Sequence, residues 1–446
     1  MDHSVNVRTD SPTILTAPNG AGKTHILLLV RAALGMDLKA LSTLIFKELE
    51  ISFSDGRGLH VSRRFDEEDS IVLSLLALDQ GLPEGDIAEF PAAELEEMRD
   101  GLPHYIRRLG NGSWLDTRTD RVLSKDMMER RFAKELQHSP KEKLRDFPEI
   151  LELYYEDQPI LIDTKRLDAV FSETPNSWRG DPYAERSVNA GAARILEYTN
   201  KLRKDVIEAR RNSIQATQSA DLSFAARAIS AAHMTVVESE LHERYDEIVE
   251  RYENLAKNSL AIGEAPIAFP QETTAAVRTI LNVFLDDWER RLEPLLPLNE
   301  KIMTLREILD IKLKQSGKKT AMSAQGSLIF KTFSEHRIQV SSLSSGEQHL
   351  VALFTLLLFS AKRGSLVLID EPEISLHAAW KHAFLADISR VAKIADLQVI
   401  LSTHSTSIIN GRWDLTEELN FPIQNSVAPP TLAEAEDASE LDDILE

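Results

Sequence analysis

The stretch TILTAPNGAGKTHILLLVRAAL, residues 13–34, establishes the class of fold. Its first four residues predict a short strand, and the apolar run from 25 to 34 predicts a buried helix that ends near Gly35. Between them lies the glycine-rich segment APNGAGKT, Ala17–Thr24. In such a turn successive backbone N–H groups converge on one point, which the N-terminus of the following helix also makes attractive to anions. The stretch therefore predicts a phosphate-binding loop between a strand and a helix of an α/β fold.

The segment matches the P-loop pattern G-x-x-x-x-G-K-[ST] except at its first position, where Ala17 replaces glycine. Lys23 is expected to reach the β- and γ-phosphates of a nucleotide, and the Thr24 hydroxyl to bind Mg²⁺. The residues expected to bind the nucleotide are Asn19, Gly20, Ala21, Gly22, Lys23 and Thr24. An incidental glycine-rich turn is the alternative, and the flanking strand and helix argue against it. Alanine is the smallest change from glycine, so we expect a loop that still binds phosphate.

A second motif, LVLIDEPE at 366–373, ends an apolar run with adjacent carboxylates. Such runs are typical of strands buried on both faces of a parallel sheet, and these sheets bind ligands at the carboxyl ends of their strands. We therefore expect Asp370 to bind Mg²⁺, and Glu371 to orient and polarise a water that attacks the γ-phosphate. A solvated strand end is the alternative, which the phosphate-binding loop in the same chain weakens.

Two further segments suit a phosphate site. In LSTHS, residues 401–405, His404 follows another apolar strand and is expected to contact the γ-phosphate, the alternative being a structural histidine. In LSSGEQ, residues 343–348, hydroxyls and a glycine N–H precede a helix and form a second anion site. Its candidate residues are Ser344, Ser345, Gly346 and Glu347.

The rest of the chain divides by pattern. Residues 48–65 alternate around Asp55-Gly56, which predicts a β-hairpin, and 159–167 are typical of a buried strand that leads into a polar loop. Residues 184–315 are helical in pattern, and a short apolar seam favours a helical hairpin or small bundle over a long coiled coil. The seam consists of Leu241, Tyr245, Ile248, Tyr252 and Leu255. We expect five parts: 1–65 and 316–425 as the two halves of a head, 66–183 as an elaboration, 184–315 as an insertion, and 426–446 as an acidic tail.

The composition limits which chemistry, location and binding partners the chain can have. The 446 residues include no cysteine, which excludes disulfides and thiol catalysis, and they contain no apolar run long enough to span a membrane. No basic segment followed by an apolar one begins the chain, so we expect a cytoplasmic protein. The net charge of −20 argues against a generally basic surface for DNA, although basic segments at 200–204 and 312–319 leave local DNA binding possible.

The four motifs, in this order, resemble the ATP-binding-cassette ATPases: Walker A at 17–24, the signature at 343–348, Walker B with its glutamate, and the switch histidine. The resemblance covers about 13–65 and 338–412. It implies a P-loop ATPase head, a mixed sheet flanked by helices, with a helical insertion between Walker A and the signature. It also implies Mg²⁺ and ATP, and a head-to-tail dimer in which Ser344 and Gly346 act in trans on the γ-phosphate.

Within that family, DEPEISLH (370–377) and GRWDLTEEL (411–419) resemble the OLD/RecF/SMC-like branch. The stand-alone ATPases of anti-phage defence modules, of the Septu, retron-associated or PARIS type, are similar in character, and in them an ATPase controls a separate nuclease or toxin. The residues after His404 are expected to be too few for the Toprim nuclease domain of OLD enzymes. Nuclease chemistry would then come from a partner effector.

The chain departs from the family at one metal position. The segment IDTKRL carries Lys165 where relatives often have the Q-loop glutamine, and Gln158 is a weaker candidate. The resemblance therefore implies ATP binding more firmly than fast turnover. The tail also carries Leu441, Ile444 and Leu445 among acidic residues, which suits either a docking motif or a solvated end.

The leading hypothesis is an ATPase switch that dimerises and hydrolyses ATP to control an effector in prokaryotic defence. One alternative is a RecF- or SMC-like ATPase that clamps DNA. The other is an ATP-binding scaffold with little turnover.

Overall fold

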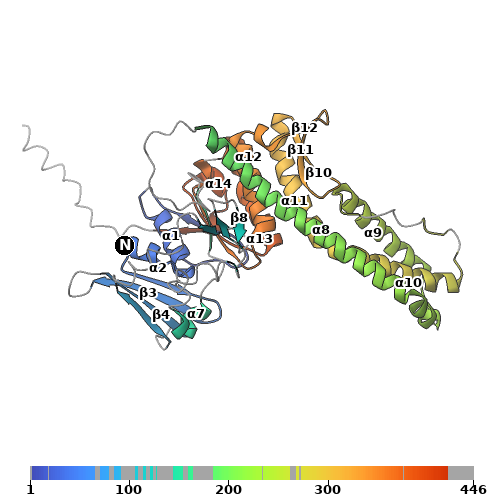
Figure 1. Cartoon of the computed structure of the whole chain (residues 1–446), viewed down its shortest axis with the longest axis horizontal. Helices are drawn as coiled ribbons and strands as arrows, with labels where there is room; N and C mark the ends of the chain where they lie inside the picture. Colours follow the sequence, from blue (N-terminus) through green and yellow to red (C-terminus); the bar gives the residue numbers. More distant parts are fainter. Residues whose placement is uncertain are drawn as a thin grey trace, which may run out of the picture.

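The strand that leads into the P-loop lies inside a parallel sheet (Figure 1). In the computed structural model of the chain, the strand order is β15–β1–β14–β13–β9, and each neighbouring pair is parallel. These strands are β1 (Thr13–Thr16), β9 (Ile160–Asp163), β13 (Leu366–Asp370), β14 (Gln398–Ser402) and β15 (Thr416–Glu418). The structure describes residues 3–18, 20–65, 71–79, 85–91, 106–108, 114–116, 121–123, 127, 144–153, 159–163, 184–233, 235–261, 268–270, 273–374 and 376–419.

Helices cover both faces of this sheet. They are α1 (Lys23–Leu34), α12 (Ser345–Thr355), which continues as a π-helical turn, and α13 (Ala378–Ala395). Because side chains alternate along a strand, Leu366 and Leu368 of β13 pack with α1, whereas Val367 and Ile369 pack into the core formed with α12 and α13. This burial on both faces explains why the strand is a continuous apolar run.

A separate antiparallel sheet lies beside α1 (Figure 1). Its strands, in spatial order, are β2 (Glu48–Ser52), β3 (Arg57–Phe65), β4 (Ile71–Asp79) and β5 (Ile87–Pro91). The predicted hairpin is confirmed, with Ile51 opposite Leu59 and the turn around Asp55-Gly56. The apolar face of the sheet packs on α2 (Leu38–Thr43) and α7 (Pro148–Glu152). Strands β4 and β5 are not evident in the sequence, because the charges and prolines of 66–160 obscure their alternation.

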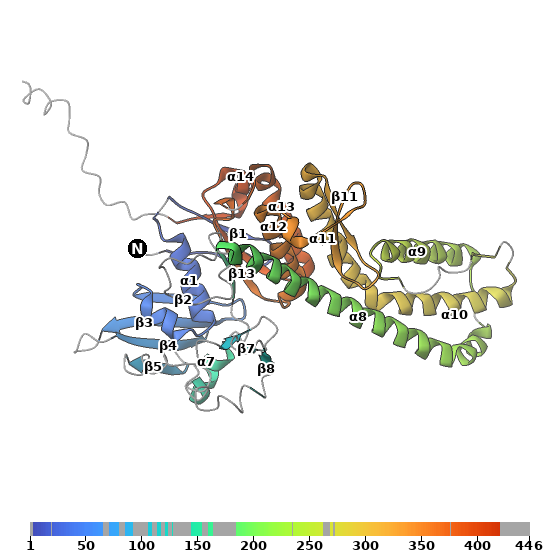
Figure 2. The ribbon, with the colours of Figure 1, turned by 45° about the horizontal axis from the view of Figure 1, so that its top comes forward.

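The helical insertion forms an arm that projects from the head (Figure 2). Its helices are α8 (Ala184–Ser230), α9 (Glu238–Lys257) and α10 (Ala275–Leu292). The last helix of the insertion, α11 (Leu296–Leu313), packs against α12 and α13 of the head. Helix α10 packs against both α8 and α9, and α8 also packs against α12 of the head. The predicted seam of α9 is confirmed, since Leu241, Ile248, Tyr252 and Leu255 are buried and Tyr245 packs against the same core. The arm is a small bundle with a long α8.

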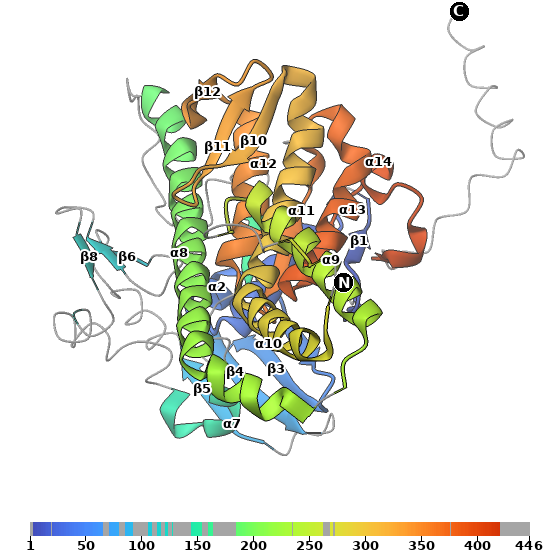
Figure 3. The same ribbon diagram turned by 90° about the vertical axis from the view of Figure 1, so that its right-hand side faces the viewer.

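Short elements complete the described residues. A three-stranded antiparallel sheet follows α11 in the chain and packs beside it (Figure 3). It consists of β10 (Lys318–Met322), β11 (Leu328–Thr332) and β12 (Arg337–Ile338). The remaining elements include β6 (Ile106–Arg108), β7 (Trp114–Asp116), β8 (Arg121–Leu123) and α14 (Thr406–Ile409). The α/β head with a helical insertion between P-loop and signature is thus confirmed. The parallel and antiparallel strands of the head lie in separate sheets, and the five-part division of the chain stays a prediction.

Candidate functional site

Three of the four motifs follow neighbouring strands. The P-loop follows β1, His404 follows β14, and Glu371 follows β13, and β14 pairs with both of the other strands. Because all three strands run parallel, their carboxyl ends lie at the same edge of the sheet. The register places Ser402 opposite both Leu15 and Asp370. Residues far apart in the sequence therefore meet at one edge.

The P-loop has the backbone that its glycines allow. Gly20 and Gly22 have φ angles of 84° and 90°, in the left-handed region where a side chain is strained, and Gly22 leads directly into α1. The Lys23 side chain is only 4% exposed, and its Nζ donates to the carbonyl oxygen of Ala17 at 3.0 Å. The ammonium group is thus held inside the loop, where a bound phosphate would replace the carbonyl as its partner.

The two candidate metal-binding residues are in direct contact. The Thr24 hydroxyl donates to Oδ2 of Asp370 at 2.7 Å, and the Ser402 hydroxyl donates to Oδ1 of the same carboxylate. Asp370 is 7% exposed. A hydroxyl and a carboxylate beside a phosphate loop fit Mg²⁺, which takes oxygen ligands and is held by one or two side chains plus substrate phosphates.

Glu371 lies between the lysine and the histidine. Its φ is 42°, an uncommon conformation for a residue other than glycine, and its N–H donates to the carbonyl oxygen of Ser402 at 2.9 Å. Its Oε1 lies 4.0 Å from Nζ of Lys23 and 3.5 Å from Nδ1 of His404. The carboxylate is partly exposed, at 25%.

The signature forms the N-terminus of α12. The Ser344 hydroxyl accepts from the N–H of Glu347, and Glu347 accepts from the N–H of Ser344, which is a capping box. Lys318 and Ser316 also donate to the Glu347 carboxylate, at 2.7 and 2.6 Å. Burial raises the pKa of Glu347, and the hydrogen bonds from Lys318, Ser316 and the Ser344 N–H outweigh it, so the net pKa is lowered. The buried glutamate therefore fixes the turn.

The two serines of the signature are exposed, whereas its Leu343, Glu347 and Gln348 are buried. Ser344 and Ser345 are exposed, and Gly346 is half-buried against the ring of Trp380. Within the described residues, no hydrogen bond or ion pair joins the signature to the P-loop. The two serine hydroxyls of the fourth motif are thus accessible from outside the chain.

Several residues of the site do not stand out in the sequence. Glu373 and Thr403, both buried, hydrogen-bond to each other at 2.8 Å beside His404, and Ser402 holds Asp370. The sequence signal for Glu373 is its place in DEPE, but its partner is revealed only by the pairing of β13 with β14. Several predicted residues lie outside the described part of the chain: Asn19, Gln158, Lys165, Leu441, Ile444 and Leu445.

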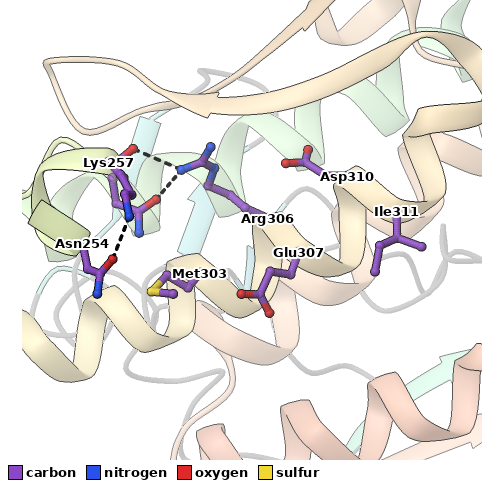
Figure 4. A pocket seen from close by; sticks show the side chains of 8 residues that line it. Asn254, Lys257, Met303, Arg306, Glu307, Asp310 and Ile311 are labelled. Atoms are coloured by element: carbon purple, nitrogen blue, oxygen red, sulfur yellow. Dashed lines mark hydrogen bonds between the residues drawn. The ribbon is translucent and has the colours of Figure 1, made fainter. Parts of the chain in front are cut away.

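A cavity elsewhere in the molecule is separate from these motifs (Figure 4). It has a volume of about 340 Å³ and lies between α9 and α11. Its walls include Arg306, which donates to Asn258 and to the carbonyl oxygen of Lys257, and Asp310, which accepts from Thr320. Because Arg306 and Asp310 already bond to neighbouring elements, the cavity is part of the arm's packing.

One family model matches a large part of the chain. Residues 131–410 match the family described as "AAA domain, putative AbiEii toxin, Type IV TA system". The match spans more than half of the chain and includes the signature, Walker B and His404, but begins after the P-loop. No curated protein matches the sequence.

Among solved structures, the chain is similar to the Smc head domain of Pyrococcus furiosus, which was solved with an extended coiled coil and bound to the C-terminal domain of ScpA. The similarity covers 90% of this chain and 85% of that one, at 16% identity and a TM-score of 0.29. The SMC head domain of Thermotoga maritima is similar over 93% and 86%, at 11% identity and a TM-score of 0.29.

The fold and the site define a P-loop ATPase head of the ATP-binding-cassette type. The chain belongs to the AAA domain family whose model it matches. No helix in the described part of the chain is long and apolar enough to cross a membrane.

Proposed function

We propose that the chain binds ATP with Mg²⁺ and hydrolyses it. The observation that carries this proposal is the convergence of Lys23, Glu371 and His404 at one sheet edge, within 4.0 and 3.5 Å of the central carboxylate. A lysine inside a glycine-rich loop, a carboxylate that can orient water and a nearby imidazole are the groups that phosphoryl transfer to water requires. A cysteine nucleophile is excluded at this edge, because the chain has no cysteine.

Each group has one expected role. Lys23 and the P-loop N–H groups bind the phosphates and stabilise the charge that develops on them. Glu371 orients and polarises the attacking water, and His404 contacts the γ-phosphate. Thr24 and Asp370 would hold Mg²⁺, which neutralises phosphate charge when it is bound.

Completion of the site is proposed to require a second copy of the chain. Ser344 and Ser345 are exposed, and Glu347 behind them fixes the turn in place before any partner arrives. An exposed helix N-terminus that carries hydroxyls can bind the γ-phosphate held by another head. We therefore infer an ATP-dependent head-to-tail dimer with Ser344 and Gly346 acting in trans.

Control of a partner effector, a nuclease or toxin, is proposed as the output of this cycle in prokaryotic defence. The family description, which names a putative toxin of a toxin–antitoxin system, supports a role with a partner. The projecting arm offers a surface for that partner (Figure 2). Co-purification followed by native mass spectrometry tests this part: a stoichiometric second protein is expected, and a chain that is always recovered alone contradicts it.

Phosphate release tests the central activity. The wild type should release phosphate from Mg-ATP at least about 10²-fold faster than Lys23→Ala or Glu371→Gln, given the usual contributions of phosphate stabilisation and base catalysis. Glu300→Gln, a change at an exposed residue of α11, is the matched control and should keep the wild-type rate. Equal rates for wild type and Lys23→Ala would instead support a scaffold that binds ATP with little turnover.

DNA binding is a second candidate, favoured by one observation. Helix α8 exposes a basic group of residues near the head, despite the net charge of −20. The group consists of Lys201, Arg203, Lys204 and Arg211. Binding of a fluorescent duplex with ATP should then fall steeply between about 50 and 200 mM salt. Reversal of Arg203 and Arg211 to glutamate should abolish it, and no binding at either salt concentration contradicts this candidate.

A further inference from the structure

Glu373 joins the ends of two neighbouring strands from a buried position. It lies two residues after Glu371, in the short turn that follows β13, and its side chain is 7% exposed. Its Oε1 accepts from the Thr403 hydroxyl at 2.8 Å and from the N–H of His404 at 3.3 Å, both in the loop that follows β14. Thr403 is fully buried. One carboxylate oxygen therefore holds the backbone on which His404 is placed.

The other oxygen of this carboxylate takes no part in holding the loop. Oε2 of Glu373 is buried and has no hydrogen-bond partner among the described residues. Burial of a carboxylate with one oxygen unpaired is unfavourable, and a neutral acceptor would hold the same loop without that cost. The ionisable group beside this carboxylate is the His404 imidazole, whose Nδ1 lies 3.5 Å from Oε1. The buried Glu373 carboxylate therefore lies beside the imidazole of His404.

His404 consequently lies between two carboxylates. Its Nδ1 is 3.5 Å from Oε1 of Glu371 and 3.5 Å from Oε1 of Glu373. The first carboxylate is partly exposed to the site, and the second is buried. A buried carboxylate beside one ring nitrogen holds an imidazole in one tautomer and one orientation, with the proton on the nitrogen that faces it. The Nε2 nitrogen then remains available to the substrate side.

We propose that Glu373 is a positioning residue for ATP hydrolysis: it fixes the backbone and imidazole of His404, and through that imidazole the direction of Glu371. The inference rests on the proposed ATPase function, because it assigns Glu373 a part in that reaction. Glu373 acts through His404 and does not touch the substrate. Loss of its charge should therefore slow the chemical step while the P-loop still binds nucleotide.

The test compares kcat and KM for Mg-ATP in Glu373→Gln and Thr403→Val. Both should lower kcat by about 10- to 100-fold, as loss of a group that orients a functional histidine does. KM should stay within about threefold, because Lys23 and the P-loop are unchanged. Thr403→Ser keeps the hydroxyl and should retain most of the rate, and the exposed Glu300→Gln is the control for a glutamate-to-glutamine change. An unchanged kcat in Glu373→Gln overturns the inference.

A double mutant separates positioning from general stability. In a His404→Ala background, Glu373→Gln should have no further effect on kcat, because the residue that it positions is gone. Multiplying losses, accompanied by a lower melting temperature in both backgrounds, would show a structural role only and overturn the inference.

A second readout does not need turnover. In protein labelled with ¹⁵N-histidine, the imidazole signals of His404, identified by their loss in His404→Gln, should show a proton on Nδ1 and should shift in Glu373→Gln. If the wild type hydrolyses ATP no faster than Lys23→Ala, the proposed function fails, and this spectrum alone decides the positioning of His404. An unshifted spectrum overturns the inference in either case.

Discussion

Lys318→Met should destabilise the protein and loosen the signature turn. The change removes the cation that neutralises Glu347, whose side chain is 5% exposed, while keeping much of the apolar lysine stem. The carboxylate retains its bonds from Ser316 and from the Ser344 N–H. It becomes a buried charge without a counterion beside it, which is the costly way to break an ion pair.

The size of the effect follows from burial. Breaking a buried pair by removing one partner costs about 3–5 kcal/mol, and a hydrogen bond to a charged group contributes about 1.5–3 kcal/mol. Because the Lys318 side chain is 18% exposed and two bonds to Glu347 survive, we expect a loss of about 2–4 kcal/mol. The double change Lys318→Met with Glu347→Gln should recover part of this loss, because no charge is then left buried.

Denaturant unfolding of the four members of this double-mutant cycle measures the effect, with ATP hydrolysis as a parallel readout. Lys319→Met is the matched control on the same strand: its partner Glu335 is 59% exposed, so the unfolding midpoint should barely move. A Lys318→Met midpoint equal to that of the control, or additive losses in the double mutant, would show that Glu347 is not a buried charge held by Lys318.

Four further changes address other parts of the molecule. The pKa of Glu347 is lowered in the folded protein, so its ionised form stabilises the fold at pH values above the ordinary pKa of about 4.5. That stabilisation is lost as pH falls through the lower folded pKa. In Glu347→Gln the free energy of unfolding should therefore depend less on pH in this acid range. Ser344→Arg should abolish hydrolysis while nucleotide affinity measured by calorimetry stays close to wild type, and parallel loss of affinity would contradict action in trans. Gly326→Ala should lower stability by about 2 kcal/mol or more, because φ is +77° and the new Cβ would lie 2.4 Å from Cγ1 of Val206; a melting temperature equal to wild type would contradict this. Asp370→Asn should lower Mg²⁺-dependent phosphate release by about 10²-fold, and a rate independent of this change in a magnesium titration would exclude Asp370 as a ligand.

The motifs could be predicted from sequence because their chemistry is local. A loop that cradles phosphate needs glycine, lysine and threonine at fixed spacing, and a strand end that faces a ligand carries Asp370 and Glu371 after an apolar run. Their convergence was also predictable, because parallel strands end at one edge of a sheet. The order of the strands in the sheet could not be predicted, and the hydrogen bond between Glu373 and Thr403, which depends on that order, could not be predicted either.

Contacts across long loops could not be predicted. Lys318 meets Glu347 because a small antiparallel sheet packs behind the signature. Nothing in the basic segment 312–319 distinguishes that lysine from the exposed Lys314, or from Lys319, whose partner is exposed. The left-handed backbone of Glu371 was likewise invisible, since glutamate has no intrinsic preference for it. Such features depend on tertiary packing, which overrides local pattern.

The proposed pairing of heads can be tested with the purified Glu371→Gln variant alone, by measuring its mass in solution in the presence of Mg-ATP. This variant should bind ATP without hydrolysing it, so the paired heads should accumulate. Size-exclusion chromatography with light scattering should then give twice the 50.1 kDa mass of one chain with Mg-ATP, and a smaller value with ADP. The same variant carrying Ser344→Arg should give the mass of a single chain. A Glu371→Gln protein that stays at the mass of one chain with saturating Mg-ATP would show that two heads do not complete the site.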